Sequence, residues 1–143
     1  MTIKILLPVD GSECSLRAVD HFVAHAGWFN GVPEVHLLHV HPPIPLGRVQ
    51  AHIGKETLHA YYQEEGEAQL AEAVRRLDAA ELAFTQHIHV GQPAEVIAKL
   101  AGELGCDLIL LGAHGRGAVA GLVTGSVTAR VLHLAPCPVL VVR

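Results

Sequence analysis

The stretch DLILLG, residues 107–112, decides the fold. Its aliphatic residues end abruptly at a glycine, and such a short, unbroken apolar run is typical of a strand that is covered on both faces of a parallel sheet. The runs IKILLPV (3–9) and PVLVV (138–142) have the same character. The runs VHLLHV (35–40) and FTQHIHV (84–90), the second of them more alternating, complete a set of five expected strands.

Amphipathic helical patterns separate these strands. They extend from Ser12, a favourable N-cap, to Gly27, from about 55 to 80, from Pro93 to Gly105 and from 126 to 134. In the long second pattern the residues expected to face inward are Leu58, Tyr61, Tyr62, Leu70, Val74 and Leu77. Strands that alternate with such helices predict an α/β fold, a doubly wound parallel sheet with helices on both faces. We expect one domain over residues 1–143.

Composition excludes several classes of protein. Of the 143 residues 50% are hydrophobic and 17% charged, and the net charge is −4, which argues against binding to nucleic acid through its phosphates. No apolar run is long enough to span a membrane, and the N-terminus shows no signal-peptide pattern, so we expect no membrane attachment. The three cysteines are far apart and form no CxxC pair, which favours reduced thiols and a cytoplasmic location.

A glycine-rich segment follows the decisive strand. Five glycines lie between positions 112 and 125, and Ser126 then begins a helix. In an open parallel sheet, ligands bind beyond the carboxyl ends of the strands, and glycines allow backbone N–H groups to approach a phosphate. The alternative is a loop whose glycines serve only turns, because glycine patterns alone are weak signals.

Other nucleotide-binding patterns are missing. Gly54-Lys55 is followed by Glu56 instead of the hydroxyl residue of a P-loop, and Val49 stands where its first glycine belongs. The first strand is followed by DGSE (10–13) and not by the GxGxxG of a dinucleotide-binding fold. A receiver domain needs clustered acids after the third strand, which here ends at Val90-Gly91.

The spacing GAHG (112–115), nine residues, then GS (125–126) resembles the ATP-binding signature G-x2-G-x9-G-[S/T] of the universal stress protein family. The segments ILLPVDGS (5–12), VGQPA (90–94) and APCPVLVV (135–142) are also similar to this family, so the resemblance covers nearly the whole chain. It implies a sheet of order 3-2-1-4-5, in which Asp10 and the glycine-rich segment face one crevice. Ala113 departs from the family pattern, which often has serine or threonine there.

The resemblance also implies a role for each matching residue. Asp10 is expected to bind the ribose or the base edge of ATP or AMP, and Mg or Mn is expected to bridge the phosphates. The adenine would lie against Pro8, Val9 and Val40. The expected phosphate contacts are Gly112, His114, Gly115, Arg116, Gly125, Ser126, Val127 and Thr128. His114 and Arg116 have a plainer reading as a packed and a solvated side chain.

We expect a sensor or regulator of the stress response and not an enzyme, because no residue pair near the glycines offers a base for more than slow hydrolysis. The alternative is a homodimeric interaction module that holds no nucleotide. The apolar strand Val139–Val142 would be an exposed edge in a monomer, so we expect a homodimer through it. His39, His41, His87 and His89 could meet on neighbouring strands, but no cysteine or carboxylate completes a ligand spacing, and we predict no metal site.

Overall fold

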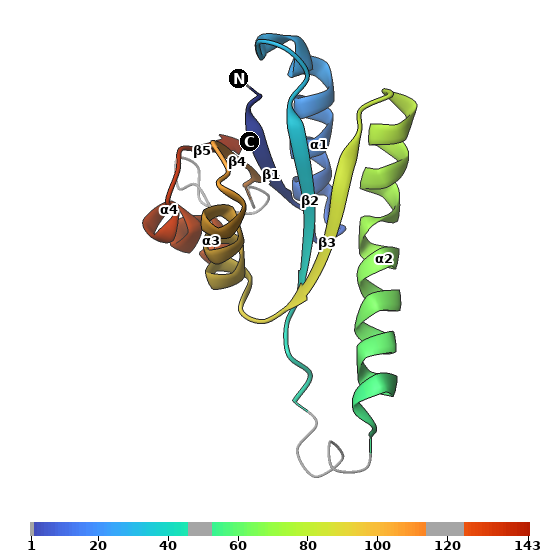
Figure 1. Cartoon of the computed structure of the whole chain (residues 1–143). Coiled ribbons are helices and arrows are strands. Elements are labelled where there is room, and N and C mark those ends of the chain that lie inside the picture. Colours follow the sequence, from blue (N-terminus) through green and yellow to red (C-terminus); the bar gives the residue numbers. More distant parts are fainter. Residues whose placement is uncertain (1, 46–52, 114–124) are drawn as a thin grey trace.

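The computed structural model describes residues 2–45, 53–113 and 125–143, and it confirms the predicted α/β fold. Five parallel strands form one sheet of order β3-β2-β1-β4-β5 (Figure 1). In that order the strands are β3 (Phe84–Val90), β2 (Glu34–His41), β1 (Lys4–Pro8), β4 (Leu108–Gly112) and β5 (Val139–Val142).

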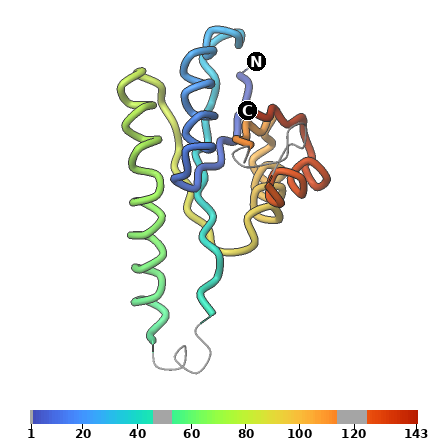
Figure 2. Tube along the Cα trace, turned by 180° about the vertical axis from the view of Figure 1, so that it is seen from behind, coloured from blue at the N-terminus to red at the C-terminus, as the bar shows by residue number. Residues whose placement is uncertain are grey.

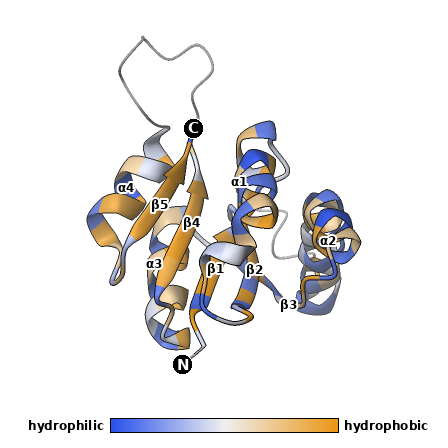
Figure 3. Cartoon of the chain, turned by 90° about the horizontal axis from the view of Figure 1, so that it is seen from above, coloured by the Kyte–Doolittle hydropathy of each residue, from blue (hydrophilic) through white to orange (hydrophobic). Residues whose placement is uncertain are grey.

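Helices cover both faces of this sheet. They are α1 (Glu13–His25), α2 (Lys55–Ala79), α3 (Pro93–Leu104) and α4 (Ser126–Leu134), with a short 3-10 turn, η1 (Ala26–Trp28), after α1. Seen from above, α1 and α2 lie on one side of the sheet and α3 and α4 on the other, as Figure 3 shows. The view from behind shows the long α2 running beside α1 (Figure 2). None of the helices in the described ranges is long and apolar enough to cross a membrane.

Two hydrophobic cores follow from the alternation of side chains along the strands. Ile5 and Leu7 of β1 point towards α1 and α2, whereas Leu6 between them points towards α3 and α4. All three side chains are completely buried. Both faces of the central strands are therefore covered, which explains why their sequence is apolar without interruption and why they are coloured hydrophobic in Figure 3.

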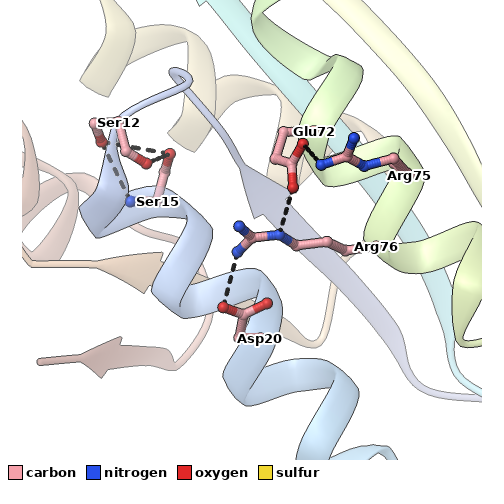
Figure 4. Close-up of polar contacts among 6 residues, drawn as sticks. All are labelled: Ser12, Ser15, Asp20, Glu72, Arg75 and Arg76. Atoms are coloured by element: carbon pink, nitrogen blue, oxygen red, sulfur yellow. Dashed lines mark hydrogen bonds and ion pairs between the residues drawn. The ribbon is translucent and has the colours of Figure 1, made fainter.

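The start of α1 and its packing against α2 are fixed by polar contacts (Figure 4). Ser12 caps α1 by accepting a hydrogen bond from the backbone N of Ser15 at 3.2 Å. Nη1 of Arg76 on α2 donates to Oδ2 of Asp20 on α1 at 2.8 Å, and its Nε donates to Oε1 of Glu72 at 3.0 Å. Because the Arg76–Asp20 pair between the helices is partly exposed, we expect it to orient α1 and α2 more than to stabilise the fold.

The buried stripe of α2 differs from the predicted one. It consists of Gly66, Leu70, Ala73 and Leu77, whereas Tyr61, which we expected to face inward, is 47% exposed. The reason is length: the first turns of α2 run past the end of β3 and have no strand to cover (Figure 1).

The two edge strands of the sheet have different surfaces. In β3 the side chains of Thr85, Gln86 and His89 are exposed. β5 consists only of valine and leucine, of which Val142 is buried and the other residues are half-buried. Apart from the exposed Val90 at the end of β3, one edge of the sheet is therefore polar and the other aliphatic.

Candidate functional site

The strand order reverses at β1, and a cavity lies at the carboxyl ends of the strands there. From β1 the chain continues into α1 on one face of the sheet, while β4 beside it leads towards α4 on the other face. Such a switch point is where open α/β sheets bind ligands. The cavity has a volume of about 100 Å³. It is lined by Pro8, Val9, Asp10, Ser12, Cys14, Ser15, Leu38, Val40, Pro93, Ile97, Leu111, Gly112, Val127 and Thr128.

A hydrogen-bond network holds Asp10 at the rim of this cavity. Oδ1 of Asp10 accepts a bond from the backbone N of Ser12 and another from Oγ of Ser15, both at 2.9 Å. Gly11 turns the chain between them with φ +82°, a conformation that glycine adopts without strain. The first turn of α1 thus fixes one carboxylate oxygen, and the exposed position of Asp10 leaves this residue in reach of solvent.

The end of β4 lies unusually close to α1. A Cβ atom on Gly112 would be 2.1 Å from the carbonyl oxygen of Cys14, so only glycine fits at this position. On the other side, Oγ1 of the buried Thr128 donates to the carbonyl oxygen of Gly112 at 3.4 Å. This contact connects the start of α4 to the end of β4, and both elements line the cavity.

The remaining walls are mostly apolar. Leu38 and Val40 of β2 and Leu111 of β4 are buried in the core beneath α3, and Ile97 of α3 packs in the same core. A flat apolar ligand group therefore finds hydrophobic surface on the sheet and on the helix, with the Asp10 carboxylate at the rim.

The N-terminus of α4 begins beside the cavity. Its N-cap residue, Gly125, has an extended backbone and no side chain with which to cap the helix. Among the described residues no side chain caps the first N–H groups of α4, and a helix end of this kind favours an anion. Ser126, the first residue of the helix, is exposed.

Seven of the predicted site residues line the cavity. Gly125 and Ser126 begin α4 but do not line it, while His114, Gly115 and Arg116 lie outside the described residues. The residues that line it are Pro8, Val9, Asp10, Val40, Gly112, Val127 and Thr128. The sequence did not lead us to expect that residues of the first turn of α1 and of α3 also line the cavity. The signals were present, because Ser12 and Pro93 mark helix starts directly after strands one and three.

The four histidines that could have met on neighbouring strands lie on opposite faces of the sheet. His39 and His41 alternate along β2 with Leu38 and Val40, which belong to the core beneath α3, and so point to the opposite face of the sheet. His87 and His89 pair in register with Leu38 and Val40 and lie on the α3 side. Within the described ranges, no three histidine, cysteine or acidic side chains are arranged to hold a metal ion.

The fold and the site define a doubly wound α/β domain with a mostly apolar cavity at its switch point. Comparison with known proteins assigns it further: the chain belongs to the universal stress protein family, whose model matches residues 1–143.

Individual relatives agree with this assignment. Universal stress protein MJ0531 of Methanocaldococcus jannaschii is 31% identical over 140 residues, which are 98% of this chain and 81% of the relative. The solved structure of the protein MJ0577 superimposes with a TM-score of 0.80 at 32% identity, covering 99% of this chain and 96% of that one. A universal stress protein solved in complex with cAMP gives a TM-score of 0.69 at 28% identity, with coverages of 99% and 96%.

Proposed function

We propose that this chain binds an adenine nucleotide, ATP or AMP, in the switch-point cavity and acts as a sensor or regulator of a stress response. One observation carries the proposal: an apolar cleft and the fixed carboxylate of Asp10 lie together at the carboxyl end of the central strand. The relative in complex with cAMP supports an adenine nucleotide as the ligand class.

The geometry suggests which part of the nucleotide each wall would contact. Leu38, Val40 and Ile97 offer apolar surface for the adenine ring, and Asp10 can accept hydrogen bonds from ribose hydroxyls. The cavity volume of about 100 Å³ is below the ~300–1,000 Å³ typical of sites that enclose a whole ligand. The cavity would thus hold the base, and the phosphates would extend towards the uncapped N-terminus of α4.

A divalent cation would be held mainly by the nucleotide. Among the described lining residues Asp10 is the single carboxylate, and one of its oxygens already accepts two hydrogen bonds. Mg or Mn would therefore bridge phosphate oxygens and neutralise part of their charge, in keeping with the oxygen ligands that Mg prefers.

We propose that the chain is not an efficient enzyme. In the described part of the cavity the hydroxyls of Ser15 and Thr128 donate to Asp10 and to the backbone of Gly112, respectively. A general base must reach the proton that it removes, and Asp10 is held beside α1 by its own network. Hydrolysis of a bound nucleotide would accordingly be slow.

We also propose a homodimer through β5. The carbonyl oxygens of Pro138 and Val142 accept hydrogen bonds from Ile109 of β4 and from Ala113 directly after it. The backbone groups of Val139 and Val141 therefore point away from β4 in the alternating pattern of a strand. An unpaired aliphatic edge is a surface that proteins normally cover. Val141→Pro would remove an outward N–H group and should convert the dimer to a monomer in analytical ultracentrifugation; an unchanged mass would exclude this interface.

Isothermal titration calorimetry with ATP, ADP, AMP and cAMP tests the nucleotide proposal, using protein that was unfolded and refolded to remove any retained ligand. Asp10→Asn keeps an acceptor for Ser12 and Ser15 but removes the charge, and should weaken binding by about tenfold or more, the loss expected for a charged hydrogen bond. The control Asp78→Asn changes an exposed acid at the end of α2 and should bind like the wild type.

Two results would contradict the proposal. One is the absence of measurable heat with every nucleotide together with the absence of adenine nucleotide in the supernatant of the denatured protein. This would favour the interaction module that holds no nucleotide. The other is equal weakening by Asp10→Asn and Asp78→Asn, which would show that net charge matters and the cavity does not.

A further inference from the structure

A polar chain connects β2 to the edge strand β3 on the sheet face towards α3. Nδ1 of His36 on β2 lies 2.9 Å from Nε2 of His87 on β3. The other ring nitrogen of His36, Nε2, lies 3.0 Å from Oε1 of Glu34. The series Glu34, His36, His87 is therefore continuous, and its last contact crosses from one strand to the next.

The protons in this chain can be assigned from its chemistry. A carboxylate only accepts hydrogen bonds, so Nε2 of His36 must carry the proton that is donated to Glu34. In a neutral His36, Nδ1 is then an acceptor, and Nε2 of His87 must donate to it. One additional proton can be held on His87 without disturbing either bond. A second additional proton would place N–H groups on both nitrogens of the 2.9 Å contact, which breaks it.

The surroundings resist double protonation of the pair. His36 is only 6% exposed. Burial, followed by the charges of His36 and His89, lowers the pKa of His87 from its ordinary value of 6.5. Glu34 is the acid in direct contact, and Lys4 of β1 lies opposite it in register. Further charged groups lie on neighbouring elements. Asp107 accepts a hydrogen bond from the backbone N of Lys4. On α3, Glu95 pairs with Arg130, and Lys99 pairs with Glu103.

We propose that Glu34, His36 and His87 form a proton-operated latch between β2 and β3, which stays closed with one added proton and opens when a second one binds. Among the strands that the structure describes, β3 has only β2 as a neighbour, and Thr85 and His89 are exposed on this face. When the latch opens, β3 keeps its backbone ladder and the packing of Ile88 against the other core but loses this side-chain contact. The latch does not depend on the proposed nucleotide.

The first measurement is hydrogen exchange of the β3 amides in the whole protein. Between about pH 6.5 and about pH 4, below the ordinary imidazole range because the pKa of His87 is lowered, we expect their protection factors to fall by about tenfold or more. Over the same range the protection of β4 amides should stay constant. The ¹⁵N shifts at neutral pH should show His36 protonated on Nε2. Constant protection of β3, or a His36 protonated on Nδ1 alone, would overturn the proposal.

Variants separate the latch from general acid sensitivity. His87→Gln offers an amide that can bond with His36 in either protonation state, so the protection of β3 should become independent of pH. The matched control His89→Gln lies on the same strand and face but outside the chain of contacts. It should keep the fall in protection, moved to slightly higher pH because the charge of His89 lowers the pKa of His87. An equal fall with pH in His87→Gln would refute the latch. Should that variant not fold, His36→Gln serves instead, because it leaves a single imidazole in the contact between β2 and β3. Protection of β3 that still fell with pH as in the wild type would refute the latch.

Discussion

The close approach of Gly112 to the first turn of α1 leads to a quantitative prediction for Gly112→Ala. The added Cβ would lie 2.1 Å from the carbonyl oxygen and 2.6 Å from the carbonyl carbon of Cys14. An ordinary van der Waals contact begins at 3.4 Å, so the two backbones must separate by about 1.3 Å. The obstacle is backbone and not the flexible end of a side chain. We therefore place the cost at the upper end of that for overpacked cores, about 3 kcal/mol.

This cost can be measured by urea unfolding followed by far-UV circular dichroism. A loss of about 3 kcal/mol lowers the ratio of folded to unfolded protein by more than about a hundredfold. It corresponds to a decrease of about 10 °C in the melting temperature of a domain of this size. The control is Gly27→Ala, because a Cβ at Gly27 would meet nothing within 4 Å. Its free energy of unfolding should stay within about 0.5 kcal/mol of the wild type.

Equal stabilities of the two variants would refute the reasoning. They would mean that β4 and α1 are not in backbone contact at Gly112, and that glycine is not required there. A selective loss in Gly112→Ala would support the geometry of the cavity itself, since Gly112 and Cys14 both line it.

Three more predictions follow from other contacts. Gly66→Ala brings a Cβ to 2.5 Å from Cγ2 of Ile88, so it should destabilise the fold by about 1–2 kcal/mol. In a double-mutant cycle, Ile88→Ala should cancel this cost, and simple additivity of the two changes would contradict the contact. Burial raises the pKa of Cys106 from 9.0 to about 11. Iodoacetamide at neutral pH should therefore label Cys106 about a hundredfold more slowly in the native than in the urea-unfolded protein, and equal rates would disprove the burial. The hydrogen bond from Arg130 lowers the pKa of Glu95 below 4.5, so the contact contributes stability above that pH and loses it as the pH falls. Arg130→Gln should remove this part of the acid sensitivity in urea titrations, and an unchanged pH profile would show that the contact is inactive.

The order and type of the elements could be predicted from the sequence because local signals agree with one another. The strand Phe84–Val90 and the helix Ser126–Leu134 have the predicted bounds. The helix at Lys55–Ala79 ends one residue before the predicted end. Apolar runs, helix caps and glycine stops all lie within a few residues of the structure that they determine, so no knowledge of distant contacts is needed.

Features that depend on register could not be predicted. The side of the sheet on which a histidine lies follows from the pairing of Leu38 with His87, a relation between residues far apart in the chain. The same pairing brings His36 to His87, which no local pattern indicates. The rule for switch points found Asp10 and Gly112, but the wall formed by Ile97 depends on how α3 packs against the sheet.

The unlike margins of the sheet limit how copies of this chain can assemble. In the proposed homodimer a second copy of the all-aliphatic β5 would cover it, whereas β3 exposes Thr85, Gln86 and His89 along with Val90. Pairing of β5 with its copy about a two-fold axis would bury this edge in both copies, and assembly would end at the dimer. Growth into an open-ended fibre would need two such edges, and of the two edge strands in the described sheet β5 alone is all-aliphatic.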